Sequence, residues 1–104
     1  MEPLWWRAGR YFRLRIRAGA NALTMTSLAL RETRYPLENK TFFVCDDPSV
    51  ESIERLSLRG LQMCAHEHYM DCPYYEQLMY VGDTRIEALL TYALTDDDRL
   101  PRRA

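Results

Sequence analysis

The chain has 104 residues, a formal net charge of −1 and an apolar fraction of 47%. This length suits one small domain, and the composition is that of a globular protein rather than a disordered one. The near-zero charge gives no electrostatic reason to expect a nucleic-acid partner, and no apolar run reaches the roughly 18 residues of a membrane-spanning helix. The first residues lack the layout of a signal peptide. Three cysteines without paired spacing indicate free thiols in a reducing compartment, so we expect a cytoplasmic protein.

The N-terminal third of the chain predicts a β-hairpin. Over residues 10–17 apolar side chains alternate with arginines, which is the two-residue period of a half-buried strand. Residues 19–21 predict a turn, and residues 23–31 predict the second strand. An isolated hairpin is marginal in water, so we expect it to need further strands. Residues 31–37 are expected to form a linker, and residues 41–45 a short strand or packed segment.

Two helices are predicted in the second half of the chain. Asp47 can cap a helix that begins at Pro48, and apolar residues at three- and four-residue steps continue this helix to about residue 68. A second helix is predicted to start near Asp83, which could itself be the N-cap. Its expected buried stripe consists of Ile86, Leu89, Leu90, Ala93 and Leu94.

Residues 71–83, between the two predicted helices, combine three carboxylates with three tyrosines. Loops held by rigid elements are common places for functional sites. Carboxylates hydrogen-bond sugar hydroxyls and donate protons, and aromatic rings cover the apolar face of a sugar. By residue type alone, the segment is typical either of a polar loop between helices or of a carbohydrate site.

A metal site is not predicted. The His66-Glu67-His68 run resembles a metal-binding pair, but residues two apart on a helix point about 200° apart. The acids at 96–98 are interpreted as a solvated turn. Cys72 is interpreted as a packing residue, because acidic neighbours raise rather than lower the pKa of a thiol.

One spacing in this segment resembles a known family. Asp-Cys-Pro at 71–73, Glu76, Tyr80 and Gly-Asp at 82–83 resemble the active-site segment of bacterial α-L-rhamnosidases. These are inverting glycoside hydrolases with an (α/α)6 barrel, also called six-hairpin glycosidases. The sequence departs from the family pattern in two ways. Many members have Trp in place of Tyr80, and many have an Arg and one more residue before the Glu.

The resemblance implies a role for each of five residues. Glu76 would be the general acid, and Asp71 and Asp83 would hold sugar hydroxyls. Tyr80, with Tyr75, would line the sugar subsite. The general base of the family is a Glu in a later barrel helix, and nothing in this sequence marks Glu67 or Glu87 as its replacement.

The resemblance also implies an α+β fold. An N-terminal β-hairpin from a β-sandwich would be followed by the first helices of an (α/α)6 barrel. Residues 1–37 would be the end of the sandwich module and a linker, and residues 38–104 the N-terminal part of the catalytic barrel. Twelve helices of about 11 residues with short loops need on the order of 200 residues, so we expect a truncated barrel.

Two functions are therefore expected as alternatives. In the first, the chain is a fragment of an inverting glycoside hydrolase that removes terminal α-L-rhamnose and is inactive alone. It would need no metal or organic cofactor, because proton transfer between carboxyls and water suffices. In the second, it is a non-catalytic carbohydrate-binding or protein-interaction fragment. Expected partners are a rhamnoside, the remainder of the enzyme, or a second copy bound through exposed apolar helix faces.

Overall fold

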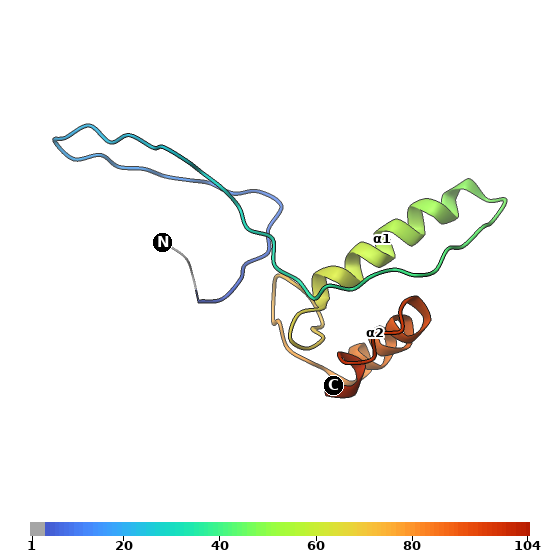
Figure 1. Cartoon of the computed structure of the whole chain (residues 1–104). Coiled ribbons are helices and arrows are strands. Elements are labelled where there is room, and N and C mark those ends of the chain that lie inside the picture. Colours follow the sequence, from blue (N-terminus) through green and yellow to red (C-terminus); the bar gives the residue numbers. More distant parts are fainter. Residues whose placement is uncertain (1–3) are drawn as a thin grey trace.

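The computed structural model describes residues 4–104, which form two α-helices and a short 3₁₀ helix (Figure 1). Helix α1 spans Pro48–Cys64, helix α2 spans Val81–Leu94, and η1 spans Pro101–Arg103. The first three residues of the predicted N-terminal module lie outside the described range. No helix within residues 4–104 has the length and apolar character needed to cross a bilayer.

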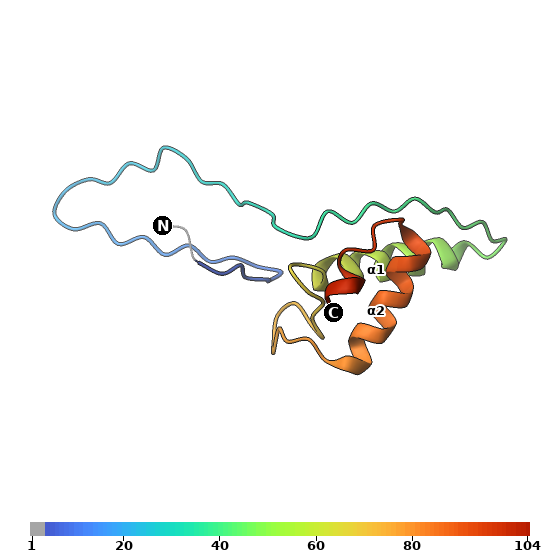
Figure 2. The same ribbon diagram turned by 60° about the horizontal axis from the view of Figure 1, so that its bottom comes forward.

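A long open arm, residues 9–33, leaves the helices at one end of the molecule (Figures 1 and 2). Every residue of the arm is exposed. The radius of gyration is 18.3 Å, whereas a compact chain of this length would have about 13 Å. The arm therefore makes no core with the rest of the described chain.

The predicted β-hairpin is absent, so the expected α+β fold is wrong and the described chain is mostly helical. Within residues 4–104 strand pairing is limited to one isolated bridge between Ala65 and Tyr69, and residues 41–45 also form no strand. The two legs of the arm separate in Figure 2. Two physical reasons apply. Tight hairpin turns need positive φ angles, which none of the described glycines has. Moreover, no other element packs beneath the apolar face of the arm.

Helix α1 begins as predicted. The Asp47 carboxylate accepts a hydrogen bond of 2.9 Å from the Ser49 N–H, which lowers the pKa of Asp47, and Pro48 occupies the first turn. The helix ends at Cys64, four residues earlier than expected. There the chain turns back, and the Met70 N–H donates to the Cys64 carbonyl at 3.0 Å. The turn delivers the following residues to the start of α2.

Helix α2 begins at Val81, so Asp83 lies in its first turn and is not the N-cap. The face turned to the core mixes polar and apolar residues: Thr91 is fully buried, Thr84 and Glu87 are half-buried, and Ala88 and Leu94 pack against the core. The predicted buried stripe is therefore wrong for all but one member. Leu94 is half-buried, whereas four members are exposed: Ile86, Leu89, Leu90 and Ala93.

The core is small and centres on Tyr69, whose side chain is fully buried. The Tyr69 hydroxyl donates to Thr91 Oγ1 at 2.6 Å, and the Thr91 hydroxyl donates to the Glu87 carbonyl at 2.9 Å. The expected linker contributes to this core, because Leu37 is buried. The buried cluster comprises Leu37, Leu61, Ala65, Tyr69 and Leu100.

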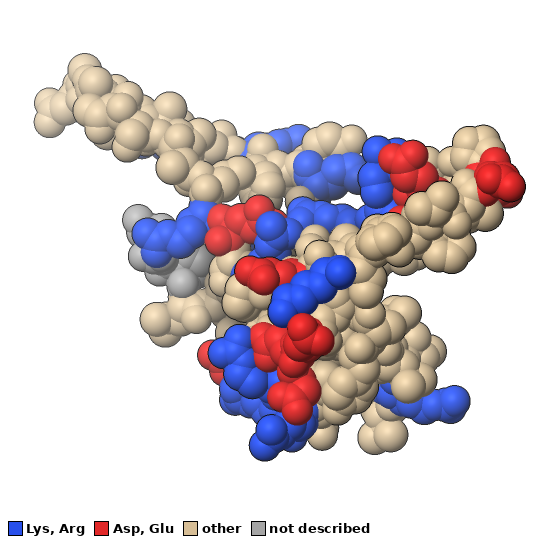
Figure 3. Space-filling view, turned by 45° about the vertical axis from the view of Figure 1, so that its right-hand side comes forward, with Lys and Arg blue, Asp and Glu red and all other residues tan. Residues whose placement is uncertain are grey.

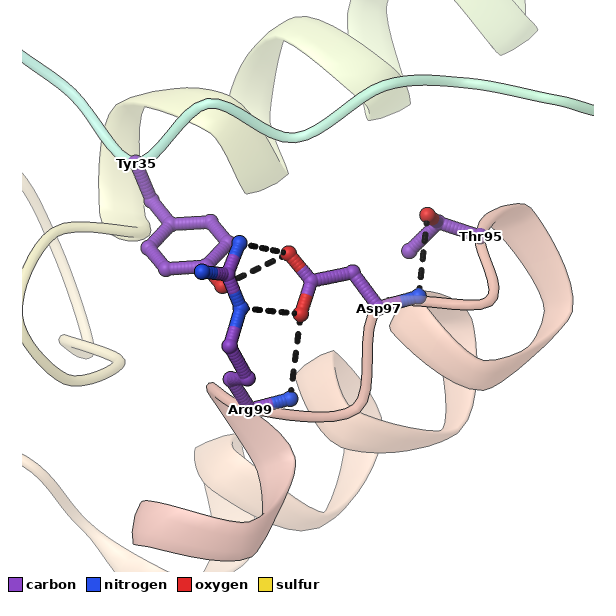
Figure 4. Close-up of polar contacts among 4 residues, drawn as sticks. All are labelled: Tyr35, Thr95, Asp97 and Arg99. Carbon is purple, nitrogen blue, oxygen red and sulfur yellow. Dashed lines mark hydrogen bonds and ion pairs between the residues drawn. The ribbon is translucent and has the colours of Figure 1, made fainter.

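A polar cluster fastens the C-terminal segment to the expected linker (Figure 4). The Asp97 carboxylate accepts hydrogen bonds from the Tyr35 hydroxyl at 2.8 Å and from Arg99 Nε and Nη2 at 2.8 and 2.6 Å. The hydrogen bonds from Arg99 and then from Tyr35 hold the pKa of Asp97 far below its usual range. The predicted solvated turn is thus, at Asp97, a structural anchor.

We predict that Tyr69→Phe destabilises the chain by about 0.5–1.5 kcal/mol, because the buried hydroxyl loses its bond to Thr91 while the ring still fills its site. For a domain of this size about 1 kcal/mol lowers the melting temperature by roughly 4–8 °C. Thermal unfolding followed by circular dichroism checks this. Tyr92→Phe on the exposed side of α2 is the matched control, and an equal loss in both variants would contradict the prediction.

Candidate functional site

The site loop, residues 71–80, joins the turn after α1 to the start of α2. Its two ends are closed by hydrogen bonds between the same two residues. The Asp71 N–H donates to the Leu78 carbonyl at 2.9 Å, and the Leu78 N–H donates to Asp71 Oδ1 at 3.1 Å. Asp71 therefore has a structural role, whatever it does for a ligand.

The tip of the site loop is held in an unusual backbone conformation. Glu76 and Gln77 have φ angles of 54° and 57°, a left-handed conformation that costs a non-glycine residue about 1–2 kcal/mol. Side-chain bonds of Gln77 hold it in place. Gln77 Nε2 donates to the Pro73 carbonyl at 2.9 Å, and Trp5 Nε1 donates to Gln77 Oε1 at 2.9 Å. Backbone strain of this kind concentrates at functional sites.

This conformation brings three of the predicted residues together. The Asp71 carboxylate and the Tyr80 hydroxyl lie close enough to the Glu76 carboxyl to shift its pKa, and the charge of Asp83 also acts on it. Asp83 stands close by, in the first turn of α2. The result is an acidic cluster of Asp71, Glu76 and Asp83 with one tyrosine, called the carboxylate cluster below.

The cluster shifts the pKa values of Glu76 and Asp71 in opposite directions. The hydrogen bond with Asp71 and then its negative charge raise the pKa of Glu76. Burial raises the pKa of Asp71, but hydrogen bonds, led by the one from the Leu78 N–H, more than offset this and leave it below its usual value. These shifts make Glu76 the weaker acid of the pair, which is the direction that a general acid needs. Glu76 is exposed, so the neighbouring acid Asp71 raises its pKa more than burial does.

Tyr75 is not part of the carboxylate cluster. Its ring is exposed and meets Tyr74 edge to face, with 4.6 Å between ring centroids. Its carbonyl accepts a hydrogen bond from the Cys72 thiol. Cys72, which was predicted to be a packing residue, thus makes a hydrogen bond inside the site loop.

Glu87 is a candidate residue that the sequence analysis considered but did not assign to a role. It is half-buried, and its Oε2 atom is buried without a hydrogen-bond partner within the described chain. Burial, followed by the charges of Asp83 and Asp71, raises the pKa of Glu87 to about 7. The only sequence signal is its position four residues after Asp83, which places both on one face of a helix. In the same region, burial and then the negative charge of Glu87 raise the pKa of Cys64 to about 11.

The two histidines are bound to backbone carbonyls. His66 Nε2 lies 3.2 Å from the Met63 carbonyl, and its ring stacks on Trp6 with 3.9 Å between centroids. His68 Nδ1 lies 2.6 Å from the Tyr69 carbonyl. In the part of the chain that the structure describes, no group of three or more His, Cys, Asp or Glu side chains is arranged to hold a metal ion.

A hollow of about 310 Å³ lies elsewhere in the molecule. It is lined by Tyr35, His66, Glu67, Arg99, Leu100 and Arg103. None of these belongs to the carboxylate cluster, so this hollow does not define the candidate site.

We predict that Glu87 makes stability depend on pH near neutrality. The folded-state pKa, about 7, lies above the ordinary 4.5, so the folded state binds this proton more tightly than the unfolded chain. The resulting stabilisation is complete below pH 4.5 and is lost as the pH rises through about 7. Melting temperatures measured from about pH 5 to about pH 8 should fall more for the unmodified chain than for Glu87→Gln. Glu38→Gln, at an exposed position, should keep the full fall.

The chain was compared with known protein families, curated proteins and solved structures. The model of the bacterial alpha-L-rhamnosidase 6 hairpin glycosidase domain matches residues 38–103, which is more than half of the chain. No curated protein and no solved structure matched in these comparisons. The family match includes α1, the site loop, α2 and η1. The chain therefore belongs to the bacterial α-L-rhamnosidase six-hairpin glycosidase family.

Proposed function

We propose that this chain supplies the general-acid side of an inverting glycoside hydrolase that removes terminal α-L-rhamnose from glycosides. The observation that carries the proposal is the proximity of the Asp71 carboxylate to Glu76, which raises the pKa of Glu76, in a chain that belongs to a glycosidase family. The family makes a carbohydrate the expected substrate. The raised pKa of Glu76 supports its role as proton donor.

In the proposed reaction, Glu76 gives its proton to the glycosidic oxygen as the bond to the sugar breaks. A water molecule attacks the opposite face of the sugar, and a second carboxylate accepts the proton of that water. Inverting enzymes hold the two carboxyls about 6.5–9.5 Å apart. Asp71 lies directly beside Glu76 and is therefore too close to be this base. We accordingly place the base outside this chain, as the family resemblance implies.

The remaining residues would bind the sugar. The carboxylates of Asp71 and Asp83 would accept hydrogen bonds from its hydroxyls. The Tyr80 ring, 44% exposed, would cover its apolar face, and the more distant Tyr75 would contribute at the edge. The chemistry needs no metal or organic cofactor, since each step moves a proton between carboxyls, water and the substrate.

The proposal also covers organisation and location. The family match begins at residue 38, which supports a module boundary after residue 37. The catalytic barrel is proposed to be completed by helices that this chain does not contain. The free thiols of Cys45, Cys64 and Cys72 support a reducing, cytoplasmic location. Neither a nucleic acid nor a membrane is proposed as a partner.

A second candidate function is a non-catalytic carbohydrate-binding or interaction fragment. The exposed apolar side of α2, with Ile86, Leu89 and Leu90, favours it because such a surface needs a partner. The two candidates differ in the use of the Glu76 proton, which binding alone does not need.

We predict that methyl α-L-rhamnoside binds at the carboxylate cluster and shifts the amide NMR signals of the site loop and the first turn of α2. Asp83→Asn should weaken this binding roughly tenfold, because a hydroxyl bound to a charged group contributes about 1.5–3 kcal/mol. Asp46→Asn, an exposed change before the cap of α1, is the matched control. Equal affinity in both variants would contradict the assignment of Asp83.

We predict that the isolated chain does not hydrolyse an aryl α-L-rhamnoside, because the base is missing. The measurement is release of the aryl alcohol, with Glu76→Gln as the background. Release above that background would show that the described residues already contain both carboxyls, and would refute the proposal that the base lies outside this chain.

A further inference from the structure

The charges of this chain are strongly segregated. Residues 4–34 contain seven arginines and one glutamate, which gives +6. Residues 35–104 contain seven basic and thirteen acidic residues, which gives −6. The formal net charge of −1 for the whole chain hides this separation. Two parts of a chain with charges of this magnitude and opposite sign attract each other or oppositely charged partners.

The basic half contains a binding surface that nothing in the described chain uses. Residues 10–17 of the arm alternate arginines with large apolar side chains, and Phe12, Leu14 and Ile16 are 64%, 57% and 47% exposed. Within residues 4–104, no ion pair involves Arg13, Arg15 or Arg17. This segment spans about 26 Å if extended at 3.3 Å per residue. It thus offers an apolar edge, a cationic edge and free backbone groups.

The acidic half contains a groove with complementary chemistry. It encloses about 240 Å³ at the start of α1, and its lining combines apolar side chains with three acids. Asp47 is occupied by the cap of α1, but the side chains of Glu51 and Glu54 have no hydrogen bond or ion pair within the described residues. The full lining is Phe43, Val44, Cys45, Asp47, Pro48, Val50, Glu51 and Glu54.

The arm of one copy does not reach its own groove. In Figures 1 and 2 the tip of the arm and the N-terminal end of α1 stand at opposite ends of a molecule 60 Å long. Figure 3 shows acidic side chains at the end opposite to the uncharged tip of the arm, residues 18–30. Contact between the two surfaces therefore requires two molecules.

We propose that residues 10–17 of one copy bind in the groove at the start of α1 of a second copy. The arginines would pair with Glu51 and Glu54, and the alternating apolar residues would pack on Phe43, Val44 and Val50. Each copy carries both surfaces, so the contact is either reciprocal in a closed dimer or head-to-tail in a longer chain. The proposal does not depend on the glycosidase function.

The test uses four versions of the full chain. The first is unmodified. The second, the arm-reversed chain, carries Arg13→Glu, Arg15→Glu and Arg17→Glu. The third, the groove-reversed chain, carries Glu51→Lys and Glu54→Lys, and leaves Asp47 in place because it caps α1. The fourth combines all five changes, which restores opposite charges across the same contact.

Molar mass is measured over a range of concentrations by sedimentation equilibrium. We expect the unmodified chain and the variant with all five changes to associate. Each variant with only one surface reversed should have a dissociation constant raised by at least roughly tenfold. Added salt should weaken the association of the first and the fourth chain. Arg85→Glu, an exposed change outside both surfaces, should leave the dissociation constant unchanged.

Three results would overturn the proposal. The first is an unmodified chain that stays monomeric at every concentration. The second is association that survives both single-surface reversals, which would point to the apolar side of α2 instead. The third is that the variant with all five changes stays monomeric although circular dichroism shows that its helices are intact. If one single-surface variant fails to fold, the other still tests the contact, because reversing the charge of either surface alone should raise the dissociation constant.

Discussion

The described structure depends on one buried side chain, Tyr69. It follows the turn that ends α1, its backbone pairs with Ala65, and its hydroxyl reaches Thr91 in the middle of α2. The two helices have few other buried contacts, so this residue fixes how the end of one helix faces the other. A buried hydroxyl without a partner would cost about 1–3 kcal/mol, and Thr91 supplies that partner. This accounts for the polar Thr91 on the inward face of α2, where Ala88 and Leu94 also pack against the core.

In the site loop, little burial is needed to make the pKa values of two acids differ. Hydrogen bonds led by the one from the Leu78 N–H lower the pKa of Asp71, and the neighbouring Asp71 carboxylate raises the pKa of Glu76. The left-handed backbone at Glu76 and Gln77 brings the carboxyls together, and the bonds of Gln77 to Pro73 and Trp5 offset the strain. An acid made in this way is open to solvent and thus to a substrate. This accessibility is consistent with proton donation to a glycosidic oxygen.

Local signals allowed good predictions, and signals that depend on distant packing did not. The Asp47 cap and the first turn at Pro48 follow from the chemistry of neighbouring residues, and both could be read from the sequence. The position of the loop between two helices followed in the same way. The hairpin failed because alternation predicts a strand only where a second sheet covers the apolar side. The inward face of α2 and the raised pKa of Glu87 could not be predicted, because both depend on what surrounds the helix in three dimensions.

The tryptophans give the chain an optical signal that is separate from the dichroism of its helices. Both tryptophans of the sequence are adjacent, at positions 5 and 6. Trp6 stacks on His66 and Trp5 is hydrogen-bonded to Gln77. Indole absorbance and fluorescence therefore arise where residues 5–6, here called the arm base, contact the turn after α1 and the site loop. Far-ultraviolet dichroism instead arises from α1 and α2. Detachment of the arm base and melting of the helices can therefore be distinguished spectroscopically in a single sample, without any added label.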